Sequence, residues 1–63
     1  MKGEIIKWFD KKGYGFISGE DGNSYFLHIK QVSGGQIPEI GNRVKFNAVK
    51  TSKGEQAQNV VIV

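Results

Sequence analysis

Apolar and polar residues alternate along most of this chain, in short runs that turn-forming residues interrupt. Alternation with a period of two is typical of strands that bury one face, and β-branched and aromatic residues favour strand over helix. Apolar residues nowhere recur at helical spacing over three turns. The pattern therefore predicts no α-helix and five short strands, at residues 3–10, 14–18, 24–29, 43–49 and 56–63.

Turn-forming residues separate these strands. The tight turns fall at residues 10–13, 19–23 and 51–54. The longest irregular stretch, residues 30–42, contains the only proline, Pro38, and residues 30–32 within it fit a single 3-10 turn. We expect one domain over residues 1–63, because a chain of this length builds a single small core.

Five short antiparallel strands cannot bury both faces of a flat sheet. Curling into a barrel hides one face and removes most of the open edge. The predicted fold is therefore all-β, a five-stranded antiparallel barrel of the OB type. The side chains that we expect in its core are Ile6, Ile17, Leu27, Val32, Val44, Phe46 and Val60.

Two of the predicted strands place ring-bearing side chains two residues apart. These side chains are Tyr14 and Phe16 in one strand and Phe26 and His28 in another. Residues two apart in a strand share a face, so the four rings would share one sheet surface. A core face would give the same alternation, but Ile17 and Leu27 occupy the opposite positions and favour exposure of the rings.

The chain carries 9 Lys and Arg against 6 Asp and Glu, a net charge of +3. This excess suits a polyanion without requiring one. Five lysines lie in the half that carries the rings: Lys2, Lys7, Lys11, Lys12 and Lys30. Four acidic residues also lie there, so the basic surface would be a local stripe. A solvated surface of mixed charge is the alternative interpretation.

Catalytic and metal-binding patterns are absent from the sequence. The chain has no cysteine and one histidine, without an acid spaced for a catalytic triad or a set of metal ligands. Residues 13–15 lack the helix and the Gly-Lys-Ser/Thr ending of a phosphate-binding loop. We therefore expect neither an enzyme, a cofactor nor a small-molecule substrate.

No apolar run approaches the roughly 20 residues that cross a bilayer. The N-terminus leads directly into a strand and has no signal-peptide core. These features predict a cytoplasmic protein without a membrane partner, and we expect a monomer.

Four blocks of sequence, in this order, resemble the cold-shock protein family. The blocks are residues 7–10 (KWFD), 12–17 (KGYGFI), 26–29 (FLHI) and 54–60 (GEQAQNV), and the resemblance extends over residues 2–60. The second and third blocks are similar to the two ribonucleoprotein motifs of that family. Its members are five-stranded barrels that bind single-stranded RNA and DNA with little sequence demand, act as RNA chaperones and often respond to cold. The resemblance implies the same fold, partners and role here.

The resemblance also implies which residues bind. Trp8, Tyr14, Phe16, Phe26 and His28 match the family's base-stacking platform. Lys7 and Lys12 match its flanking cations, Phe9 matches an aromatic at its edge for which packing is the competing interpretation, and Gln56 matches a polar residue at its rim. The full predicted nucleic-acid-binding set is Lys7, Trp8, Phe9, Asp10, Lys12, Tyr14, Phe16, Phe26, His28, Ile29, Lys30 and Gln56.

The chain departs from the family pattern at several positions. Asp10 stands where asparagine is common, and Ile29 stands where an aromatic is usual; strict alternation would point Ile29 inward. The loop at residues 33–40 is shortened and lacks a phenylalanine, for which Ile37 or Ile40 could substitute as an apolar contact. Two fewer rings predict weaker binding or a shorter site.

Stacking on rings tolerates sequence because every base has a π-face, and lysines attract the phosphates. A stacking platform requires unpaired bases and should reject duplex. The resemblance adds a mild preference for pyrimidines. The alternative is a small β-barrel interaction module whose rings grip an extended or proline-rich peptide. The neighbouring lysines mildly disfavour it, and binding of a peptide without any response to oligonucleotide would select it.

Overall fold

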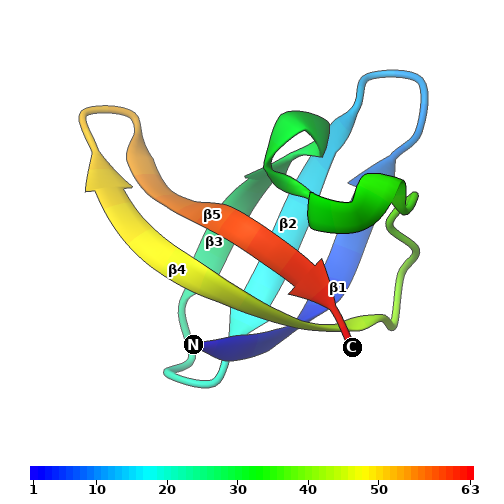
Figure 1. Cartoon of the computed structure of the whole chain (residues 1–63). Helices are drawn as coiled ribbons and strands as arrows, with labels where there is room; N and C mark the ends of the chain where they lie inside the picture. Colours follow the sequence, from blue (N-terminus) through cyan, green and yellow to red (C-terminus); the bar gives the residue numbers. More distant parts are fainter.

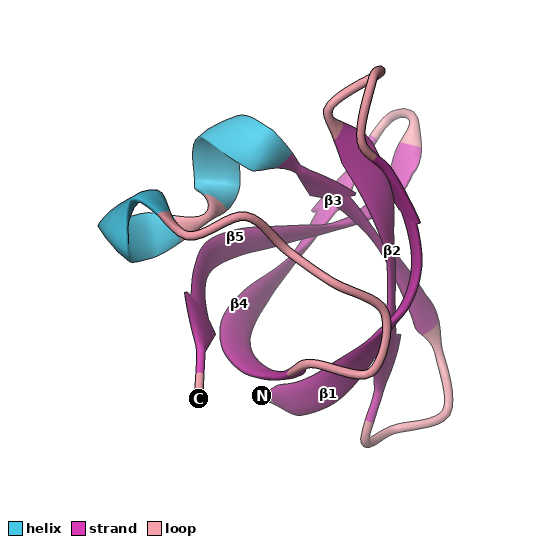
Figure 2. Ribbon diagram, turned by 90° about the vertical axis from the view of Figure 1, so that its right-hand side faces the viewer, coloured by secondary structure: helices cyan, strands magenta, loops and turns pink.

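In the computed structural model, which describes all 63 residues, five strands close into a barrel (Figure 1). The strands are β1 (Lys2–Phe9), β2 (Tyr14–Gly19), β3 (Ser24–His28), β4 (Arg43–Thr51) and β5 (Gly54–Ile62). Two 3-10 turns, η1 (Ile29–Gln31) and η2 (Ser33–Gly35), follow β3 and lie outside the barrel (Figure 2). The predicted five-stranded barrel is confirmed. Neither 3-10 turn is long or apolar enough to span a membrane.

The strands follow the order β1-β2-β3-β5-β4 around the barrel, and β4 pairs with β1 to close it. Four pairings are antiparallel, but β3 and β5 run parallel, so the sheet is mixed rather than antiparallel throughout as predicted. The reason is geometric. Successive strands reverse direction along the chain, so β3 and β5, with β4 between them in sequence, point the same way.

The barrel interior holds eight buried apolar residues. They are Ile5, Ile17, Tyr25, Leu27, Val44, Phe46, Ala57 and Val60. The prediction is confirmed for Ile17, Leu27, Val44, Phe46 and Val60. Val32 is only half-buried, packs against this core and forms a parallel bridge with Val60.

The predicted core position of Ile6 is wrong, because β1 contains a β-bulge. Ile5 pairs with Ile17 and Lys7 pairs with Phe16, which leaves Ile6 as an extra residue without a partner. An extra residue shifts the alternation by one, so side chains before and after it change faces. Ile5 is consequently buried, whereas Ile6 is 40% exposed. The bulge also sends Lys7 to the outer face of the barrel.

Tyr25 belongs to the core although the sequence analysis did not place it there. The residue is 3% exposed, and its ring centroid lies 5.1 Å from that of Phe46. Its hydroxyl donates a hydrogen bond of 2.5 Å to Asp21, which also accepts from the backbone and side-chain nitrogens of Asn23. This bond lowers the pKa of the Asp21 carboxyl and raises the pKa of the Tyr25 hydroxyl. The network fixes the turn between β2 and β3.

Strands β4 and β5 extend further toward their connecting turn than the sequence predicted. Only Ser52 and Lys53 separate them, and Gly54 follows with a φ of 117° that favours glycine. The Thr51 hydroxyl donates to the carbonyl of Gly54 and accepts from the amide of Lys53. The turn is therefore tight, and it brings Lys53 to the end of the hairpin.

Candidate functional site

The strand register arranges the outer side chains of β1, β2 and β3 in two neighbouring rows. The first row holds Phe9, Tyr14 and His28; the second holds Lys7, Phe16, Phe26 and Gln56. The residues that alternate with these along β2 and β3 face inward and are buried; they are Gly15, Ile17 and Leu27. The rings on β2 and β3 are thus outside the core, as the positions of Ile17 and Leu27 on the opposite face indicated. We call the five rings Phe9, Tyr14, Phe16, Phe26 and His28 the ring face.

The five rings form one continuous surface. Phe26 is central, because its ring centroid lies 5.5 Å from that of Tyr14, 5.9 Å from that of Phe16 and 6.4 Å from that of His28. Phe9 extends the surface at 5.5 Å from Tyr14 and is itself exposed. These separations are typical of favourable aromatic pairs. Each ring therefore supports its neighbour while part of it stays accessible to a ligand.

Trp8 lies apart from the ring face. It pairs with Gly15, on the inward side of β1, and packs half-buried against the core at the end of the barrel. A Cβ on Gly15 would overlap the carbonyl oxygen of Lys7, so glycine is required for this close approach of β1 and β2. The Trp8 Nε1–H donates a 3.0 Å hydrogen bond to Oδ1 of Asp10, which fixes the indole.

Trp8 forms one side of a hollow of about 320 Å³. We call this hollow the tryptophan slot; its lining residues are Trp8, Asp10, Lys11, Lys12, Gly13, Ile29 and Ile37. The amide of Ile29 donates to the carbonyl of Gly13, which joins the start of η1 to the turn between β1 and β2. The slot thus combines an indole, aliphatic side chains, one carboxylate and two lysines.

The inward orientation expected for Ile29 is wrong. Strand β3 ends at His28, so the alternation stops there and Ile29 enters η1 with 36% of its surface exposed. Of the two candidates for the missing phenylalanine, Ile37 lines the slot and Ile40 does not. Both are 68% exposed. An aliphatic side chain therefore occupies this edge of the slot.

His28 holds the start of η1 through one of its ring nitrogens. Its Nδ1 accepts a 3.1 Å hydrogen bond from the amide of Lys30 and caps η1. In the neutral imidazole the proton must then lie on Nε2, because a nitrogen that accepts cannot also carry the hydrogen. The same bond holds Lys30 next to the ring face.

Gln56 lies beside Phe26 through the parallel pairing of β3 and β5. A groove of about 450 Å³ runs there, lined by Phe16, Ser24, Phe26, Lys53, Glu55 and Gln56. Lys53 and Glu55 were not among the predicted binding residues. Both lie next to or within the block at residues 54–60, but their proximity to the rings depends on the parallel pairing, which the sequence pattern did not predict.

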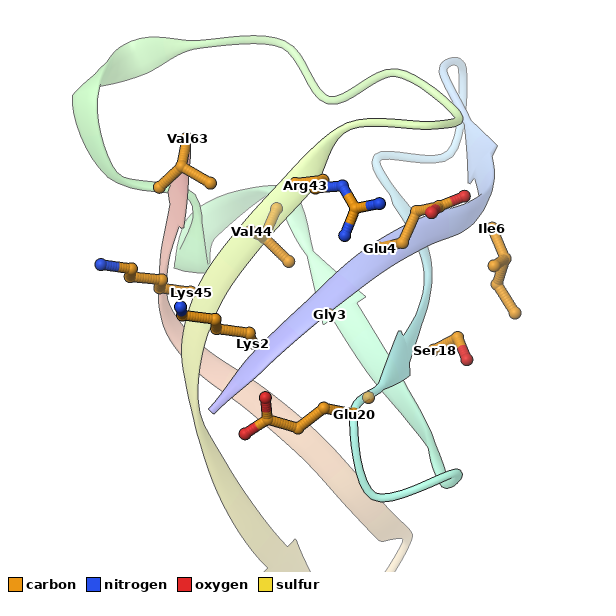
Figure 3. Close-up of a pocket in the computed structure, with 11 residues that line it drawn as sticks. Lys2, Gly3, Glu4, Ile6, Ser18, Glu20, Arg43, Val44, Lys45 and Val63 are labelled. Atoms are coloured by element: carbon orange, nitrogen blue, oxygen red, sulfur yellow. The ribbon is translucent and has the colours of Figure 1, made fainter.

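A different hollow, of about 580 Å³, lies toward the other end of β1 (Figure 3). Its charged lining residues are Lys2, Glu4, Glu20, Arg43 and Lys45, and we call it the charged pocket. Lys2 pairs with Lys45 and Glu4 pairs with Arg43 across β1 and β4. No aromatic side chain lines this pocket. No cluster of three or more His, Cys, Asp or Glu residues in the structure could hold a metal ion.

The structure thus gathers the twelve predicted binding residues in two adjoining places. Lys7, Gln56 and Lys30 border the ring face, which contains Phe9, Tyr14, Phe16, Phe26 and His28. Trp8, Asp10, Lys12 and Ile29 line the tryptophan slot. Lysines lie next to both the ring face and the tryptophan slot, so cations flank the rings as the charge distribution suggested.

Comparison with known proteins relates the whole chain to one family. Residues 1–63 match the family described as the 'Cold-shock' DNA-binding domain. The chain is 47% identical over 64 residues to Cold shock protein 1 of Lactiplantibacillus plantarum, with 97% of each chain covered. It is 44% identical to Cold shock-like protein CspC of Bacillus cereus, again with 97% of each covered. It is 41% identical to Major cold shock protein CspA of Pseudomonas aeruginosa, covering 92% of this chain and 88% of that one.

A solved structure agrees on the fold. The structure titled drosophila Unr CSD456 aligns with a TM-score of 0.75 and 20% sequence identity. The alignment covers 98% of this chain and 26% of that one. At this identity the likeness concerns the barrel alone.

Proposed function

The chain belongs to the cold-shock domain family, a family of nucleic-acid-binding domains, and we propose that it binds single-stranded RNA and DNA with little demand on sequence. The observation that carries the proposal is the ring face. Five rings, one of them an imidazole, lie on the outer surface of the barrel with neighbouring centroids 5.5 to 6.4 Å apart. A surface of this kind offers successive unpaired bases a place to stack.

Two kinds of contact would supply the affinity. Stacking of a base on an aromatic side chain contributes about 1–3 kcal/mol and does not depend on the identity of the base. Lysines that contact phosphates release counterions, so affinity falls with salt by a log–log slope of about 0.7 per contact on single strands. In this proposal Lys7 serves the ring face, Lys12 serves the tryptophan slot, and Lys30 lies beside His28.

The same surface explains why duplex should be a poor ligand. Paired bases are already stacked and cannot lie flat on protein rings. Binding to the open strand then shifts the equilibrium of an RNA hairpin toward its unpaired form by mass action. We therefore propose an RNA chaperone that works without ATP and takes part in the response to cold. A monomeric state and a cytoplasmic location belong to the same proposal, which requires no catalytic residue or cofactor.

Aliphatic side chains at two edges of the site should limit its reach. Ile29 and Ile37 line the tryptophan slot and offer contact area without a π-system. We therefore expect the chain to occlude fewer nucleotides, or to bind more weakly, than relatives with aromatic residues there. Counting nucleotides per bound protein on a long single strand tests this expectation. A full-length site with full affinity would contradict it.

The proposal is tested by titrating the protein with an unstructured pyrimidine oligonucleotide and following the fluorescence of Trp8, the only tryptophan. We expect strong quenching by the single strand, weaker binding as salt is raised, and no response to a duplex of the same sequence. Equal binding of duplex would contradict the stacking mechanism. No binding of either oligonucleotide, together with binding of a proline-rich peptide, would select the interaction-module alternative.

A further inference from the structure

The tryptophan slot contains a feature that the ring face lacks, a carboxylate held at the edge of an indole. The hydrogen bond from Trp8 Nε1 to Asp10 Oδ1 is 3.0 Å long. An indole N–H lies in the plane of its ring, so the Asp10 carboxylate must lie near the rim of that plane. A base stacked on the indole would present its own edge close to this carboxylate.

The second oxygen of Asp10, Oδ2, has no hydrogen-bond partner within the protein. An ionised carboxylate only accepts hydrogen bonds, and each of its oxygens can accept more than one. The slot therefore offers a carboxylate acceptor at the place where a base edge would lie, and its side-chain donors other than the indole are the flexible ammonium groups of Lys11 and Lys12. Pockets for small ligands have volumes of about 300–1,000 Å³, so a hollow of about 320 Å³ suits a single base.

Bases differ in the hydrogen-bond donors that their Watson–Crick edges offer to an acceptor such as a carboxylate. The Watson–Crick edge of guanine carries two adjacent donors, N1–H and the N2 amine, which match the two oxygens of a carboxylate. Cytosine and adenine carry one amine next to a ring nitrogen that accepts. Uracil and thymine carry one N–H between two carbonyl oxygens, which a carboxylate repels. Asp10 is exposed in the free protein, so a stacked base displaces water from its carboxylate, and a base without a donor there is disfavoured because it leaves Oδ2 unpaired.

We propose that Asp10 makes the tryptophan slot selective for guanine over uracil or thymine. The inference rests on the proposed binding of single strands and deepens it. It departs from the mild pyrimidine preference that the family resemblance implies, because that preference takes no account of the charge at residue 10. Gln56, which borders the ring face, carries both a donor and an acceptor and gives no comparable selection.

Asp10→Asn is the variant that separates base selection from support of the indole. The asparagine oxygen can still accept from Trp8 Nε1, so the indole keeps its partner. The new amide places a donor where Oδ2 was and removes the charge, which suits a uracil carbonyl. The matched control is Glu20→Gln, which removes the same charge in the charged pocket.

The experiment compares two oligonucleotides, a uracil heptamer and the same heptamer with one central guanine. Both lie within the range of about 4–16 nucleotides that one OB fold covers. Affinities are measured by anisotropy of an end-labelled strand at fixed salt, because guanine itself can quench fluorescence. A good bidentate contact discriminates between bases by at least several-fold, so we expect the guanine strand to bind about tenfold more tightly. The advantage should persist in Glu20→Gln and fall below about twofold in Asp10→Asn.

Modified bases test the inference on the wild-type protein. Replacing guanine by inosine removes the N2 amine and should abolish most of the advantage. Replacing it by 7-deazaguanine leaves the Watson–Crick edge intact and should preserve the advantage.

Equal affinity for the two heptamers would overturn the inference while leaving the proposed function intact. An advantage that survives in Asp10→Asn would also overturn it. Failure to bind either heptamer would instead contradict the proposed function.

Discussion

On the outer surface of β1, Lys7 and Phe9 border rings on β2, whereas Lys2 and Glu4, beyond the bulge, lie in the charged pocket. The charged pocket is the larger hollow, at about 580 Å³ against about 320 Å³ for the tryptophan slot. It nevertheless lacks an aromatic side chain and mixes both signs of charge. The tryptophan slot also combines a carboxylate with lysines, so the aromatic ring, and not the sign of the charge, distinguishes the two hollows.

The two regions share strands, so the fold alone does not distinguish them. On β2 the outward positions change from Tyr14 and Phe16 to Ser18 within a few residues. On β1 the change coincides with the bulge at Ile6. The side chains that each strand presents, rather than the depth of a hollow, therefore identify the candidate binding surface.

The largest effect is expected on the free energy of unfolding, from the core residue of β1 that precedes the bulge. Ile5→Ala should lower the free energy of unfolding by about 2–5 kcal/mol, because it removes fully buried methyl groups. Ile6→Ala, one residue away at the bulge, should change it by less than about 0.5 kcal/mol. Urea unfolding of both variants measures the difference. Equal losses would show that the bulge does not separate the two isoleucines as described.

The second largest effect is expected on the affinity for a single strand, and it should depend on the ring face. Phe26→Ala removes the central ring and should weaken binding of a single strand by about 1–3 kcal/mol, or about 5- to 150-fold. Lys45→Ala, in the charged pocket, should alter the affinity by less than about twofold. Anisotropy titration at moderate salt measures both. A larger loss in Lys45→Ala than in Phe26→Ala would reverse the comparison.

Salt dependence should separate the lysines of the two regions. Lys7 lies in the row of Phe16, so Lys7→Gln should reduce the log–log salt slope by about 0.7, the value for one phosphate contact on a single strand. Lys45→Gln carries the same change of charge and should leave the slope unaltered. Affinities measured over a series of salt concentrations give the slopes. Identical slopes for both variants would mean that the net charge matters and the position does not.

The smallest effect is expected on the pH dependence of stability, through the turn between β2 and β3 next to the charged pocket. The hydrogen bond from Tyr25 lowers the pKa of the Asp21 carboxyl in the folded protein. The resulting stabilisation is present above the unfolded pKa of about 3.9 and is lost as the pH falls through the folded value. Asp21→Asn should therefore be less stable than wild type near neutral pH, and the gap should narrow in acid, below about pH 4.

Unfolding curves at several pH values test this prediction, and binding to the ring face should stay unchanged in Asp21→Asn. A gap that stays constant with pH would contradict the role given to the Asp21–Tyr25 bond.

The strands could be predicted from the sequence because apolar and polar residues alternate along most of their length. The bulge could not, since the adjacent Ile5 and Ile6 are equally apolar and only the pairing of β1 with β2 selects Ile5 for the core. Tyr25 shares the inward phase of Leu27, so its burial was visible in the alternation. Its burial also requires a hydrogen-bond partner for the hydroxyl, and that partner, Asp21, became evident only in the structure.

The side chains that the structure gathers at the candidate site were named from the sequence, but their arrangement was not. The resemblance grouped Trp8 with the rings of the platform, whereas alternation along β1 places it on the opposite side from Lys7 and Phe9. Lys53 lines the same groove as Phe16 and Phe26 because β3 and β5 pair in parallel. Local pattern carries no information on which distant strands become neighbours, so this proximity became evident only in the three-dimensional structure.

The central claim is that single strands bind the ring face and the tryptophan slot and not the charged pocket. The most direct test is amide chemical-shift mapping of the labelled protein as an unlabelled uracil heptamer is added. The account predicts the largest shifts at Trp8, Phe16, Phe26 and His28, with little change at Lys2 and Lys45. Shifts centred on the charged pocket, or the same shifts on adding duplex, would contradict it.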